Sequence, residues 1–131
     1  MKQLSAPTQQ QIAAYLTSSQ VRPLENALYA YHFSGGAADQ IFSALAAFQN
    51  PDGGFGHGME PDLRLPASSV IATSVAFQRL REVHAPASHP LVVSGCRYLR
   101  DQYDATRANW DIIPPTIDDA PHAPWWVYGG D

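Results

Sequence analysis

Four side chains that could do chemistry lie within one eight-residue stretch of the chain: His57, Glu60, Asp62 and Arg64. Such a loop could bind a ligand at the rim of a cavity, or supply an acid and a base. The alternative is structural, with Glu60 and Asp62 capping helix ends or pairing with Arg64. Zinc uses these ligand types but the spacing is not a standard one, so we predict no metal and no cofactor.

A second set of candidates lies nearer the C-terminus. Asp118, Asp119 and His122 are followed at once by Trp125 and Trp126. Adjacent carboxylates can raise one another's pKa and so generate an acid, which makes these three residues the catalytic candidates. Aromatic walls suit a hydrocarbon or a carbocation, so the tryptophans join the ligand-binding candidates. The structural alternative is an Asx turn at the acids, with both tryptophans filling the core.

Composition narrows the functional classes. The chain has 131 residues, a formal net charge of -4 and eight scattered basic residues, which argues against a nucleic-acid surface. Neither a membrane-spanning apolar run nor a signal-peptide core is found, and the stretch "MKQLSAPTQQ" opens the chain. One cysteine, Cys96, is compatible with a reducing cytoplasm, and we interpret it as a buried apolar residue.

Elements with apolar residues at helical spacing must position both sets of candidate residues. The sequence shows no alternation of apolar and polar residues that would indicate a strand. We therefore predict an all-α fold, a single α-helical domain over 1–131 built from antiparallel helix pairs. The chain after Asp104 is expected to be structured loop. The predicted helices begin and end near residues 7–17, 23–33, 37–48, 68–83 and 90–103.

The expected buried faces follow from this spacing. Val70, Ala76, Phe77, Leu80 and Val83 would share one face of the fourth helix. The fifth helix would bury a face made of Val92, Cys96, Leu99 and Tyr103.

Two of the helix ends are followed by similar turns. In 48–56, "FQNPDGGFG" places Gln49, Gly53 and Phe55 in a Q-x-x-x-G-x-F pattern. In 99–110, Gln102 and Trp110 form a looser version. A Gln at a helix C-terminus can bond the adjacent turn, and Pro and Gly favour that turn. The aromatic would then cover the helix end, so each turn would join neighbouring helices.

The first turn resembles the QW repeat of squalene and oxidosqualene cyclases and of protein prenyltransferase β subunits. The resemblance covers about 37–126, and "IDDAPHAPWW" is similar to a group of bacterial proteins of that superfamily without an assigned reaction. It implies a segment of an (α/α)6 toroid and an apolar, isoprenoid-like ligand. Two of the superfamily's motifs are incomplete, because Thr116 replaces the first Asp of D-x-D-D and Ser94 replaces the zinc-ligand Asp before Cys96.

Two functional classes follow. One is an enzyme of the cyclase or prenyltransferase type, or a piece of a longer one. The other is a non-catalytic module that binds a ligand or a partner chain, and the incomplete motifs favour it for these 131 residues.

Five helices cannot close a toroid that needs about twelve, so the resemblance implies an uncovered apolar flank. We therefore predict that the chain forms homo-oligomers, or packs against another chain, through the fourth and fifth helices or the Trp125–Trp126 segment. Sedimentation at low micromolar concentration should show a species larger than a monomer. A monomer that neither Trp125→Ala nor Trp126→Ala alters would mean that the tail is internal core.

Overall fold

The computed structural model describes residues 4–129, so the first three residues of the opening stretch and the last two of the aromatic tail lie outside it. The chain divides into two compact units, 1–45 and 46–131. That the two units belong to one domain over 1–131 stays a prediction. Within residues 4–129, none of the helices is both long and apolar enough to cross a membrane.

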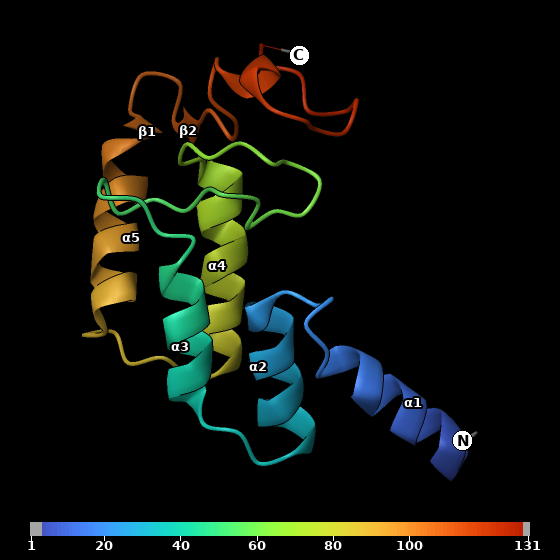
Figure 1. Ribbon diagram of the computed structural model, residues 1–131. Coiled ribbons are helices and arrows are strands. Elements are labelled where there is room, and N and C mark those ends of the chain that lie inside the picture. The colour runs from blue at the N-terminus through green and yellow to red at the C-terminus, as the bar shows by residue number, and fades with distance from the viewer. Residues whose placement is uncertain (1–3, 130–131) are drawn as a thin grey trace. The chain divides into compact units, whose positions relative to one another are not determined.

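The first unit is formed by three helices (Figure 1). They are α1 (Ala6–Leu16), α2 (Pro23–Phe33) and α3 (Ala38–Ala46). Pro23 opens α2, where its missing N–H leaves no intrahelical bond unmade. The fully buried side chains are Leu24 on α2 and Ile41 and Leu45 on α3. Ile41 and Leu45 are four residues apart and therefore lie on one face of α3. No residue of α1 is buried.

The second unit is built on α4 (Val70–Glu82) and α5 (Pro90–Asp101), which run antiparallel (Figure 1). Ser69 caps α4, since its Oγ accepts a hydrogen bond of 3.1 Å from the N–H of Ala72. The helical prediction is confirmed for all five segments, with bounds shifted by a few residues.

Contact between α4 and α5 depends on a glycine. A Cβ added at Gly95 would lie 2.4 Å from Cε2 of Phe77, so the ring occupies the place of a side chain. The buried face of α5 is therefore Leu91, Gly95 and Tyr98. The predicted face with Cys96 is wrong by one position, and Cys96 is exposed. Hydrophobic spacing missed the true face because its central residue has no side chain.

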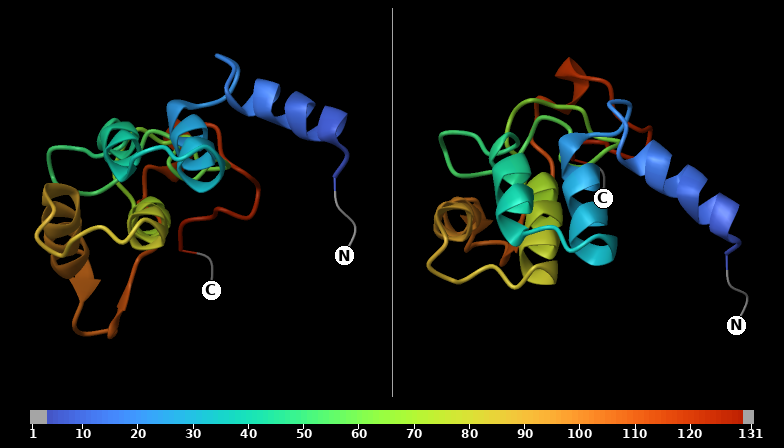
Figure 2. Two further views of the ribbon diagram at one scale, coloured as in Figure 1. Left: turned by 90° about the horizontal axis from the view of Figure 1, so that it is seen from below. Right: turned by 60° about the horizontal axis from the view of Figure 1, so that its bottom comes forward.

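Two features of the second unit were not predicted. Residues after α5 form a short antiparallel hairpin, β1 (Tyr103–Asp104) and β2 (Asn109–Trp110), which leaves the end of α5 (Figure 2). A short 3-10 helix, η1, spans Ile117–Asp119. The fold is thus mostly helical with a small sheet, and the expectation of loop alone after Asp104 is wrong. Strand periodicity cannot reveal strands of two residues.

The predicted Gln49 turn is confirmed. Its Nε2 donates to the carbonyl of Gly53 at 2.9 Å and to that of Leu91, on α5, at 3.2 Å. Gly53 has a φ of 88°, and a Cβ there would meet the carbonyl of Ser94 at 2.5 Å, so only glycine fits. Phe55, the aromatic of the repeat, is fully buried. This turn joins the long connection between α3 and α4 to α5.

The turn after α5 uses its aromatic residue differently. Nε1 of Trp110 donates to the carbonyl of Leu99 at 2.7 Å, and its ring packs on Tyr103 with centroids 4.8 Å apart. Trp110 therefore folds back on the helix end, as the repeat predicts. Gln102 is the C-cap residue of α5, bonding through its backbone N–H while its side chain is exposed.

Gln49 and Gln102 provide a matched test of how the side chain of the glutamine stabilises each helix-end turn. Gln49→Ala removes two hydrogen bonds and should lower the free energy of unfolding by about 1–2 kcal/mol. Gln102→Ala should change it by less than about 0.5 kcal/mol. Urea denaturation measures both. Equal effects of the two substitutions would contradict this account of the Gln49 turn.

Candidate functional site

The loop that carries the first set of candidates is fixed by its backbone. The N–H of His57 donates to the carbonyl of Leu65 at 2.9 Å, so the two ends of the loop 57–65 lie side by side. His57 is exposed with a φ of 55°, and its Nε2 lies 2.9 Å from Oδ1 of Asn50. Arg64 is exposed and Glu60 half-buried. His57 is thus engaged with the preceding turn.

The structure brings the two candidate segments together, although about sixty residues separate them. The N–H of Arg64 donates to the carbonyl of Pro121 at 3.0 Å, and that of Ala123 to the carbonyl of Asp62 at 2.9 Å. Leu63 and His122 form an antiparallel bridge between these bonds. The C-terminal segment therefore runs along the loop as a short strand-like pair.

One side-chain bond joins the two sets directly. Nε1 of Trp126 donates to Oδ1 of Asp62 at 2.9 Å. The same tryptophan packs on a buried cluster formed by Leu63, Leu65, Ile113 and Ile117. Asp62 thus neither caps a helix end nor pairs with Arg64 in the described bonds. Both residues fix the tail, which is the structural role weighed for Trp126.

The predicted acid pair lies on the surface. Asp118 belongs to η1, and its side chain is 89% exposed. Nε2 of His122 lies 3.6 Å from Oδ1 of Asp118, while its Nδ1 is 2.9 Å from the carbonyl of Ala120. Asp119 is exposed as well. Both carboxylates therefore face water rather than an enclosed site.

A groove of about 760 Å³ lies between the hairpin and the C-terminal segment. Trp110, Ile112 and Ile113 line one side, and the segment 125–129 lines the other. Trp125 is 68% exposed here, in contrast to its half-buried neighbour Trp126. Both predicted ligand-binding tryptophans thus line the groove, and Trp125 is the more exposed of the two.

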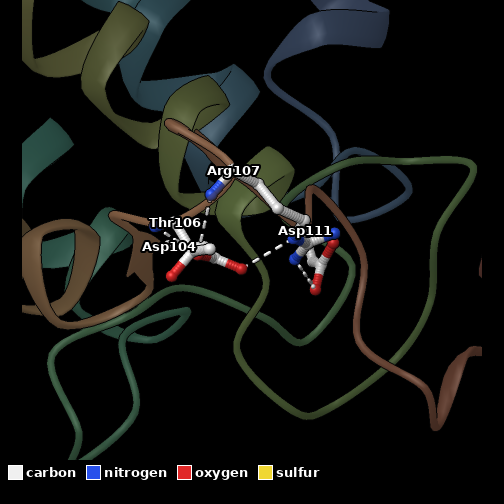
Figure 3. A network of polar contacts seen from close by, with 4 residues as sticks. All are labelled: Asp104, Thr106, Arg107 and Asp111. Carbon is white, nitrogen blue, oxygen red and sulfur yellow. Dashed lines mark hydrogen bonds and ion pairs between the residues drawn. The ribbon is translucent and has the colours of Figure 1, made fainter.

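Arg107 and Asp111, which line the groove, form a charged network with Asp104 (Figure 3). The guanidinium of Arg107 donates to Oδ2 of Asp104 at 2.6 Å and to Oδ2 of Asp111 at 2.8 Å. These hydrogen bonds lower the pKa of both carboxyls and raise that of Arg107. Oδ1 of Asp104 also accepts from the N–H groups of Thr106 and Arg107, which shapes the hairpin turn.

Sequence reasoning missed this network. Asp104, Arg107 and Asp111 are three and four residues apart, a spacing that pairs side chains on a helix, but this stretch was expected to be loop. In the structure the same spacing crosses a hairpin, where three charged groups share one turn.

A second unpredicted network holds the base of the long loop. Oγ of Ser68 donates to Oδ1 of Asp52 at 2.8 Å, and Nδ2 of Asn50 donates to Oγ of Ser68 at 3.0 Å.

Burial, with a contribution from the negative charge of Asp52, raises the pKa of Tyr98 to about 12. The Tyr98 hydroxyl is therefore neutral throughout the physiological range.

No group of three or more His, Cys, Asp or Glu side chains within 4–129 has the arrangement of a metal site. Comparisons with protein-family models, curated proteins and solved structures find no match to this chain.

The Asp62–Trp126 bond gives a direct test of how the tail is held. Asp62→Ala removes the acceptor of the half-buried indole and should lower the free energy of unfolding by about 1–2 kcal/mol. Asp118→Ala, at an exposed acid of the other set, should change it by less than about 0.5 kcal/mol. Thermal or urea unfolding distinguishes them. A neutral Asp62→Ala would mean that the tail is not anchored at this point.

Proposed function

We propose that this chain is a helical-repeat module built like a segment of an α/α toroid, and that its groove binds an apolar, isoprenoid-like molecule. The aromatic groove along Trp110 and Trp125 carries the proposal. The toroid architecture is supported by the antiparallel α4 and α5 and by the two helix-end turns at Gln49 and Trp110.

The aromatic part of the groove's lining suits a flat apolar ligand, whereas Arg107, Asn109 and Asp111 make the rest of it polar. Its volume is within the range of small-molecule sites, roughly 300–1,000 Å³. Trp125, Val127 and Tyr128 are exposed along one side, and Ile112 is exposed on the other. Covering these side chains with a hydrocarbon would remove apolar surface from water, the main driving force of such binding. The faces of the indole rings also suit the double bonds of an isoprenoid.

The charges of the Arg107 network favour a neutral ligand over a diphosphate. Arg107 is the cationic residue of the lining, and two carboxylates already hold its guanidinium. A diphosphate would have to compete with Asp104 and Asp111 for this single cation. An isoprenoid alcohol or hydrocarbon meets no such competition.

Binding without turnover fits the positions of the acids. Asp118, Asp119 and His122 are not among the residues that line the groove. Asp118 is highly exposed, so it would be a poor acid toward a hydrocarbon that it does not face. An enzymatic role is therefore proposed only for a longer chain that completes the toroid.

The alternative function is partner binding, and one observation favours it. The exposed Trp125, Val127 and Tyr128 form an apolar edge on the C-terminal segment. A second copy of the chain or another protein could cover this edge instead of a small molecule. The oligomer predicted from the sequence would form here.

Tryptophan fluorescence tests the ligand. Farnesol should quench the emission and bind with a measurable Kd, and farnesyl diphosphate should bind no more tightly than the alcohol. Trp125→Ala should weaken farnesol binding by about tenfold, since an aromatic wall is lost. Phe33→Ala, at another highly exposed aromatic on α2, is the matched control and should leave the Kd unchanged.

Two results would overturn the proposal. One is tighter binding of the diphosphate, which would call for a cationic site elsewhere. The other is an absence of farnesol binding together with an oligomer that Trp125→Ala dissociates, which would support partner binding in its place.

A further inference from the structure

A second hollow lies at the opposite end of the α4–α5 pair from the hairpin. It has a volume of about 470 Å³ and is formed by the last turns of α4, the loop 83–89 and the first turn of α5. Most of its lining is apolar, from Phe77, Leu80, Ala85, Ala87 and Val92. This pocket shares no lining residue with the groove along Trp110 and Trp125.

Two polar side chains complete the lining, and one of them is a guanidinium. They are Arg81 and His84. Arg81 makes no ion pair with a described residue, whereas Arg79, two positions earlier, is paired with Glu82 at 3.0 Å. Arg81 is cationic at every physiological pH, and its planar fork matches a carboxylate. The pocket thus joins an apolar interior to an uncompensated cation.

The backbone around the pocket is already satisfied. The N–H of His84 donates to the carbonyl of Arg81 at 3.0 Å, and that of Ala85 to the carbonyl of Leu80 at 2.9 Å. His84 adopts a left-handed φ of 55° to make this turn. A ligand is therefore not needed to close the end of α4, and the charge of Arg81 stays available to a bound anion.

We propose that this pocket binds an amphipathic carboxylate, a medium-chain fatty acid, with its carboxylate on Arg81 and its alkyl chain among Phe77, Leu80 and Val92. Charge complementarity selects an anion, and the apolar lining suits its alkyl chain. His84 adds a second hydrogen-bond donor or acceptor at the mouth. This site is separate from the groove and does not depend on the proposed isoprenoid.

Calorimetric titration of the full chain with decanoate, below its micellar concentration and near neutral pH, tests the proposal. Decanoate should bind about tenfold more tightly than decanol, because only the acid makes a charge-assisted bond. Arg81→Gln should weaken decanoate about tenfold and leave decanol unchanged, and Arg81→Lys should recover part of the loss. Arg79→Gln is the matched control and should change neither ligand by more than about twofold.

A blocking variant places the alkyl chain. Ala87 is exposed on the loop at the pocket, so Ala87→Trp should abolish binding of both ligands while the circular dichroism spectrum is retained. Trp125→Ala, in the groove, should leave decanoate binding intact. The proposal is overturned if decanol matches decanoate, if Arg81→Gln equals Arg79→Gln, or if Ala87→Trp binds normally. Tighter binding of an acidic apolar peptide than of decanoate would also overturn it, in favour of a protein partner.

Discussion

The second unit depends on the burial of Phe55 at the centre of the long connection. Its N–H donates to Oγ1 of Thr73 on α4 at 3.0 Å, and its carbonyl accepts from the N–H of Ser69 at 3.0 Å. Its ring lies against α5, 3.6 Å from where a Cβ of Gly95 would be. One residue of an irregular segment thus contacts both helices, and replacing so large a buried ring by Ala would cost about 3–5 kcal/mol.

The positions of the loop and tail follow from this contact. With Phe55 buried and Gln49 bonded to α5, the loop leaves the helices at a fixed point and returns to Ser69. The backbone of the loop then forms hydrogen bonds with the C-terminal segment, and the indole of Trp126 donates to the side chain of Asp62. Trp125 is left exposed beside the hairpin, where it forms a wall of the groove. The same tryptophan pair therefore supplies one half-buried anchor and one open surface.

The sequence predicted the helices and the Gln49 turn because helical spacing, Pro and Gly are local signals. It did not predict that Asp62 and Trp126 would bond, since their separation along the chain leaves no periodic trace. The buried face of α5 was wrong because Gly95, which permits the closest contact, does not register as hydrophobic. The network of Arg107 was missed because the chain after Asp104 was expected to be loop, and the sequence has no local signal for charges paired across a hairpin.

Hydrogen exchange at the amide of Phe55 tests the central claim, that the long connection is held as firmly as the helices α4 and α5 on which it packs. This amide is bonded to a fully buried hydroxyl, that of Thr73. It should exchange as slowly as the amide of Leu80 in α4, through the same cooperative opening. Exchange as fast as that of Asp52, at the exposed tip of the turn, would contradict the account, because the loop would then open independently of the helices.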